Sequence, residues 1–157
     1  ESFPTLPVVL AAWFHDGVYD GERDAEERSA TWAEDALPLL DDAVCDEATV
    51  AEVARLVRLT ETHRPEADDP AGCALSDADL AILAAPAERY SAYVAAVRTE
   101  YPQLDDATFA AGRALVLADL LDKPQLFHTP HALAHWEAPA RANAARELEQ
   151  LRALQTA

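Results

Sequence analysis

Apolar residues recur along the chain at spacings of three and four, which places side chains on one face of an α-helix. Runs that alternate apolar and polar positions, as a half-buried strand would, are nearly absent. The chain holds only four glycines, and its ten prolines mark most of the segment ends. We therefore expect an all-α fold of about seven helices, near residues 7–16, 25–37, 48–63, 76–85, 87–101, 105–122 and 139–154.

The segment 48–63 shows how this pattern places a polar side chain. Leu56, Leu59 and His63 follow one another at i, i+3 and i+7, so His63 projects from a partly buried helix face. Pro65 stops this helix because proline lacks a backbone donor. We expect a loop over residues 65–75.

The next helix is expected to begin at Ser76, a residue type that caps helix starts. Asp77 and Asp79 would then lie in the first turn, where carboxylates meet the positive end of the helix dipole. A purely structural role, stabilising the helix start, is therefore open to both aspartates.

The length of 157 residues suits one domain, with a core over about residues 1–122. The alanine-rich segment of about residues 139–155 carries an apolar stripe. We expect it to dock on the body or to form a homodimer. Half of the residues are apolar and 26% are charged, as in ordinary globular proteins.

The charge balance is strongly acidic, with 29 Asp and Glu against 12 Lys and Arg, a net charge of −17. This disfavours binding to a nucleic-acid duplex or an anionic membrane, since both require clustered basic residues. Cys45 and Cys73 lack the spacing of a thiolate zinc site. The longest apolar run, 7–14, is too short to span a bilayer. We expect a cytoplasmic protein.

The dipeptide His15-Asp16 ends this apolar run. Imidazole and carboxylate groups together bind divalent transition metals. Adjacent helical side chains point about 100° apart, so joint binding requires the helix to end here, and Gly17 offers that ending. A helix-terminal histidine beside a solvated aspartate is the alternative.

The surrounding sequence, AAWFHDGVYD over residues 11–20 and DAEERSA over 24–30, resembles a bacterial branch of the HD-domain superfamily of metal-dependent phosphohydrolases. In this branch a WFHDxVYD segment is followed shortly by EERSA. The resemblance covers nearly the whole chain, continuing in order through Leu59-Thr60, His63, residues 76–83 and residues 141–148.

The resemblance implies an HD-domain-like helical bundle that holds one divalent metal ion, Mn, Fe, Co, Ni, Zn or Mg. His15 and Asp16 match the family's central His-Asp pair, and Asp79 is the expected distant ligand, with Asp77 as its competitor. The family takes a first histidine from an upstream segment, but no histidine precedes His15 here. We expect the helices that would carry it to be missing ahead of Glu1, and natural loss, which would leave only three of four protein ligands, is the alternative.

The resemblance also implies hydrolysis of a phosphate by a metal-activated water, and four residues are candidates for this chemistry. We expect Asp16 and Glu27 to be catalytic, and His63 and Arg28 to contact the substrate. A hydrogen-bonded, partly buried histidine is the alternative for His63, and an exposed acidic helix start is the alternative for Glu27. Surface ion pairing is the alternative for Arg28 and for Arg64, the other possible phosphate clamp.

The expected substrate is a nucleotide or another small phosphate ester or anhydride. A catalytically silent HD-type domain that binds a nucleotide, or serves as a regulatory or structural unit, is the alternative. Oxidative chemistry with two irons would require two further histidines between Asp16 and Asp79, and only His63 lies there.

A second histidine group, His128, His131 and His135, has spacings that can bind metal. Pro130 interrupts it and Glu137 is its only nearby acidic residue, so we interpret these as incidental loop histidines. Four aromatic residues are expected to pack in the core rather than to stack on a base: Trp13, Phe14, Tyr19 and Trp32.

Overall fold

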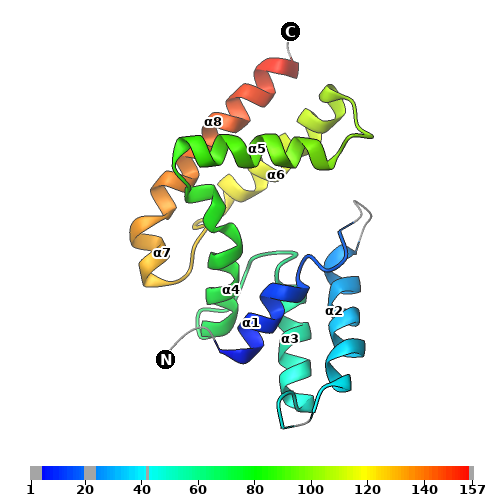
Figure 1. The fold of residues 1–157 in the computed structure, drawn as a ribbon. Helices are drawn as coiled ribbons and strands as arrows, with labels where there is room; N and C mark the ends of the chain where they lie inside the picture. The colour runs from blue at the N-terminus through cyan, green and yellow to red at the C-terminus, as the bar shows by residue number, and fades with distance from the viewer. Residues whose placement is uncertain (1–4, 20–23, 42, 156–157) are drawn as a thin grey trace. The chain divides into compact units, whose positions relative to one another are not determined.

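A computed structural model describes residues 5–19, 24–41 and 43–155 of the chain (Figure 1). No residue in these ranges lies in a β-strand, which confirms the all-α prediction. None of the helices found there is long and apolar enough to cross a bilayer. They are α1 (Leu6–Phe14), α2 (Ala25–Ala36), α3 (Glu47–Leu59), α4 (Pro70–Leu80), α5 (Ala87–Glu100), α6 (Asp106–Asp122), α7 (Pro130–His135) and α8 (Glu137–Gln155), with 3-10 helices η1 (Leu37–Leu39) and η2 (Ala81–Ala84).

The chain divides into two compact units, Glu1–Asp79 and Leu80–Ala157. The first unit contains α1, α2, α3 and nearly all of α4, and the second contains η2 and α5 to α8. Each unit has hydrophobic core residues of its own. That the two form one HD-like domain over residues 1–157 stays a prediction.

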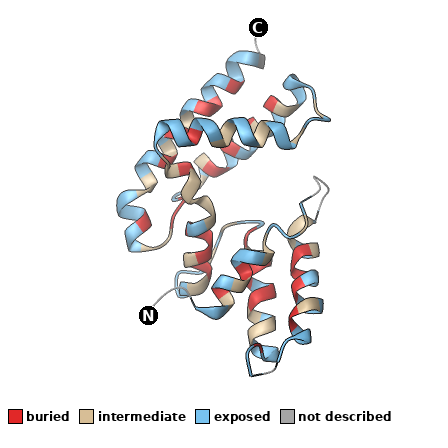
Figure 2. Ribbon diagram, in the orientation of Figure 1, coloured by how far each residue is buried: buried red, intermediate tan, exposed pale blue. Residues whose placement is uncertain are grey.

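Helix α3 packs against both α1 and α2 in the first unit. Asp46 starts it by accepting the Thr49 N–H at 2.8 Å, which satisfies one of the free donors at the helix N-terminus. The buried positions of α3 follow one stripe (Figure 2), and alanines on α1 and α2 allow close approach of the helices. The buried residues of these three helices are Val8, Ala11, Ser29, Ala30, Ala33, Val53, Ala54, Leu56 and Val57.

Helix α4 begins at Pro70, so the expected loop over 65–75 and the cap at Ser76 are both wrong. Asp69 caps this helix instead, because its Oδ1 accepts the Gly72 N–H at 2.9 Å. Pro70 follows at the first helical position, where a missing N–H costs nothing. Ser76 is buried inside the helix.

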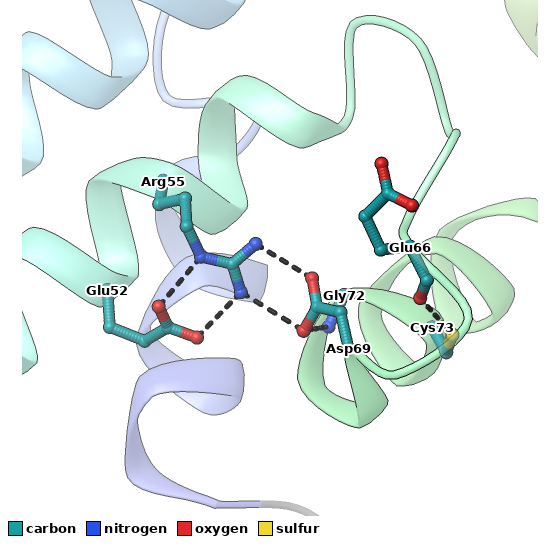
Figure 3. Close-up of polar contacts among 6 residues, drawn as sticks. All are labelled: Glu52, Arg55, Glu66, Asp69, Gly72 and Cys73. Atoms are coloured by element: carbon teal, nitrogen blue, oxygen red, sulfur yellow. Dashed lines mark hydrogen bonds and ion pairs between the residues drawn. The ribbon is translucent and has the colours of Figure 1, made fainter.

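An ion-pair network holds the start of α4 against α3 (Figure 3). Arg55 donates to both carboxylate oxygens of Asp69, at 2.7 and 3.1 Å, and to both oxygens of Glu52, at 2.7 and 2.8 Å. A Cβ on Gly72 would lie 2.6 Å from Cδ2 of Leu59, so a larger residue would push the helices apart. These contacts fix where the acidic C-terminal end of α4 lies.

Two further differences concern helix ends. Helix α3 ends at Leu59 rather than at residue 63, because the N–H groups of Thr60, Glu61 and Thr62 bond to carbonyls three residues back instead of four. Residues 130–135 form an additional short helix, α7, whose start is capped by Thr129. The described residues therefore form eight α-helices, where seven were expected.

In the second unit, α8 packs against α6 and η2. Asn143 of α8 donates to the Leu83 carbonyl at 2.8 Å, and buried Glu147 accepts hydrogen bonds from Tyr90 and Arg113. The apolar stripe of this C-terminal helix is buried within the unit, at Ala140, Asn143, Ala144, Leu148 and Leu151.

Candidate metal centre

His15 and Asp16 lie in a turn immediately after α1, which ends at Phe14 rather than at the expected residue 16. The His15 N–H still bonds to the Ala11 carbonyl at 2.9 Å, and the Gly17 N–H closes the turn on Phe14 at 2.8 Å. Because Asp16 is outside the helix, the angle between adjacent helical side chains no longer separates the pair. Nε2 of His15 lies 3.3 Å from Oδ2 of Asp16.

Helix α2 holds this turn in place through two side chains. The fully buried Ser29 accepts the Val18 N–H on its Oγ at 3.0 Å. One turn later, Trp32 packs against Phe14 with ring centroids 5.4 Å apart. A Cβ on Gly17 would lie 2.6 Å from the Trp32 ring, so this position requires glycine. These contacts explain why the motif over residues 11–20 is followed closely by the motif over residues 24–30.

Asp79 reaches the same histidine from the C-terminal end of α4. Its Oδ1 lies 3.4 Å from Nε2 of His15. A carboxylate here meets the negative end of the helix dipole, so the role of stabilising a helix start is wrong for Asp79. Asp77, two residues earlier, lies on a different helix face and is buried. Asp79 is thus the carboxylate that faces His15.

His63 approaches Asp79 from the turn after α3. Its backbone is left-handed, with φ of 48°, a conformation in which histidine is enriched among non-glycine residues. Nε2 lies 3.5 Å from Oδ2 of Asp79, and Nδ1 lies 3.3 Å from Oγ of Ser76. His63 is partly buried and hydrogen-bonded, as the structural alternative for this residue expects. It also faces Asp79, the carboxylate that His15 faces.

The protonation of His15 is set by its three polar neighbours. Nδ1 donates to the Ala12 carbonyl at 2.9 Å, which leaves Nε2 directed at the carboxylates. Hydrogen bonds to Asp16 and then Asp79 raise the pKa of His15 to about 10, and the His15 hydrogen bond lowers the pKa of Asp16. Without metal, His15 is therefore an imidazolium at neutral pH.

The donor set fits a divalent cation. Two carboxylates balance a 2+ charge, and a histidine whose other nitrogen donates to a carbonyl is the usual form of a metal ligand. The distances of 3.3 and 3.4 Å from His15 to the carboxylates match the spacing of about 3.3 Å between ligand atoms around a tetrahedral ion. Among the described residues, no group of three or more His, Cys, Asp or Glu side chains is placed so that it could hold a metal ion as it stands. Asp16, 68% exposed, is the ligand that would turn inward.

Glu27, expected to be catalytic, pairs with an arginine of the neighbouring helix. It forms a bidentate ion pair with Arg58 of α3, at 2.6 and 2.7 Å, and Arg58 also binds Glu34. The hydrogen bond from Arg58 lowers the pKa of Glu27, which makes the carboxylate a weaker base. Arg28, the expected phosphate contact, is half-buried on α2 beside Ser29, and its role stays a prediction.

The remaining candidates separate by exposure. His131 and His135 lie on α7 with stacked rings. The expectation that they are loop histidines is therefore wrong. Trp13, Tyr19 and Trp32 are 80%, 54% and 50% exposed, which contradicts their expected place in the core. Phe14 does pack against the core of the first unit.

Sequence reasoning missed Ser76 and the Ala12 carbonyl, which hold the two imidazoles. Ser76 was interpreted as a cap, although its position three residues before Asp79 puts both on one helix face. A carbonyl has no signature in the sequence.

Comparison of the chain with known protein families, curated proteins and solved structures finds no match. The HD-domain resemblance therefore stays a prediction from the motifs quoted above.

Proposed function

We propose that the chain is a metal-dependent phosphohydrolase that acts on a nucleotide or another small phosphate ester or anhydride. His15, Asp16 and Asp79 would hold one divalent metal ion. When bound, the ion would lower the pKa of a water molecule and neutralise charge on the phosphoryl oxygens.

The observation that carries this proposal is the environment of His15. Its Nδ1 is tied to a backbone carbonyl while its Nε2 faces carboxylates from two segments far apart in the sequence. A histidine needed only to end a helix requires neither carboxylate. The arrangement is the one that a metal-binding histidine uses to fix its tautomer and ring orientation.

His63 would contact the substrate. When the Ser76 hydroxyl donates to Nδ1, Nε2 carries the ring proton and can donate it to a phosphoryl oxygen. Asp79 faces this Nε2 at 3.5 Å and orients it. Because Glu27 is paired with Arg58, we assign it no step in the reaction.

The acidic composition restricts the substrate to a small molecule. A net charge of −17 repels phosphate over most of the surface, whereas a 2+ ion bound in a small site attracts it locally. Extended polyanions would meet that repulsion outside the site.

Phosphate release by the full chain tests the proposal. Mn²⁺, Co²⁺ and Mg²⁺ would be supplied in turn, with a panel of nucleotides and small phosphate esters. We expect activity with at least one metal, a loss of about 100-fold or more in Asp79→Asn, and no change in Asp119→Asn, which alters an exposed aspartate on α6. A chain that binds metal but releases no phosphate from the panel would support the catalytically silent alternative.

A further inference from the structure

Trp32 on α2 presents an aromatic surface beside the candidate metal centre. Part of its indole is held by the Gly17 backbone and by Phe14, and 50% of the residue remains exposed. Burying such a ring contributes strongly to stability, so a fixed indole on a half-exposed residue is available for a ligand.

The Trp32 ring contacts the residue that follows a proposed metal ligand. A methyl group on Gly17 would approach the Trp32 ring to 2.6 Å, and Gly17 directly follows Asp16. Because consecutive Cα atoms are about 3.8 Å apart, the Trp32 ring lies within about 8 Å of the Asp16 Cα, a distance comparable to the span from phosphate to base in a nucleotide. One small ligand can therefore contact both the metal centre and the indole.

We infer that Trp32 is a stacking platform for the base of a nucleotide whose phosphate lies at the metal centre. This inference rests on the proposed function and narrows its substrate to nucleotides. Stacking on an aromatic side chain contributes about 1 to 3 kcal/mol per base without regard to base identity. Trp32 thus supplies affinity for the nucleoside and little discrimination among bases.

The charge of the protein explains why such a platform is useful. Carboxylates dominate the surface, so the phosphate gains binding energy mainly at the metal. The base is uncharged and escapes this repulsion. Because Gly17 and Phe14 already fix the indole, stacking costs little side-chain entropy.

The test measures the dissociation constants of three probes on the Mn²⁺-loaded full chain: adenosine 5′-monophosphate, ribose 5-phosphate and adenosine. The informative quantity is the preference for adenosine 5′-monophosphate over ribose 5-phosphate. We expect Trp32→Leu, which keeps an apolar contact to Phe14, to reduce this preference about tenfold or more. Trp32→Phe should retain most of it.

Trp13→Ala is the matched control, because Trp13 is a more exposed tryptophan on α1 and should leave the preference unchanged. An equal preference in wild type, Trp32→Leu and Trp13→Ala would overturn the platform. If wild type bound adenosine through Trp32 but did not bind ribose 5-phosphate, the proposed function would fail while the platform stood. If wild type bound none of the three probes, both would fail.

Discussion

Nε2 of His15 lies 3.4 Å from Oδ1 of Asp79, which joins the turn after α1 to the C-terminal end of α4. Neither residue gains stability for its own helix from this contact. Asp79 is at the unfavourable end of the helix dipole, and His15 follows the last residue of α1. We propose that the pair is kept for a shared metal ion rather than for local helix stability.

Asp79 and Asp77 should differ sharply in their effect on metal affinity. Asp79→Asn removes a carboxylate that faces both imidazoles, so we expect Mn²⁺ affinity to fall about 100-fold or more. Asp77→Asn alters a buried residue on another helix face and should affect folding more than affinity. Isothermal titration calorimetry of both variants gives the ranking. A greater loss of affinity in Asp77→Asn would reassign the ligand.

The stability of the metal-free protein should depend on pH through His15. Its pKa is raised from 6.5 to about 10 in the fold, first by the hydrogen bond to Asp16 and then by that to Asp79. The protonated ring therefore stabilises the fold fully below pH 6.5, and this contribution is lost as the pH rises through about 10.

Thermal melts of metal-free protein between pH 6.5 and 10 check this expectation. The Tm should fall with rising pH more steeply in wild type than in Asp79→Asn, because the variant retains less of the pKa shift. The comparison between the two proteins removes the contribution of other titrating groups. Parallel curves would show that the contact does not form in solution.

The cap of α4 should matter more than the ion pair beside it. Asp69→Ala removes the hydrogen bond to the Gly72 N–H as well as the pair with Arg55, so we expect a loss of about 1 to 2 kcal/mol in the free energy of unfolding. Glu52→Ala removes only a half-exposed pair with Arg55 and should cost less than about 1 kcal/mol. Urea unfolding measures both. Equal losses would mean that Asp69 does not cap the helix.

The helical fold could be predicted from the sequence because its signal is local. Apolar spacing and proline positions predicted most of the helices. The same spacing predicted the stripe of α8 to which the buried residues Ala140 and Leu148 belong. The start of α4 was misplaced because Ser76 and Asp69 are both acceptable caps. The Asp69-Pro70 pair decides between them, together with Arg55 from another helix.

The candidate site was predictable only in part. The motif around His15 and Asp16 indicates a metal pair, and the order of motifs pointed to Asp79. The pairing of Glu27 with Arg58 could not be read from helical periodicity, because periodicity gives the buried face of a helix and not its neighbour. The exposure of Trp13 was missed for the same reason.

Mn²⁺ binding to the full chain at pH 7, measured by calorimetry with the release of protons, tests the central claim most directly. We predict one ion per chain and the release of about one proton, because binding must displace the proton held by His15. Asp16→Ala should abolish this binding with helicity unchanged by circular dichroism, and Asp35→Ala, an exposed aspartate on α2, should retain it. Undiminished binding in Asp16→Ala, or no binding by wild type, would contradict the account.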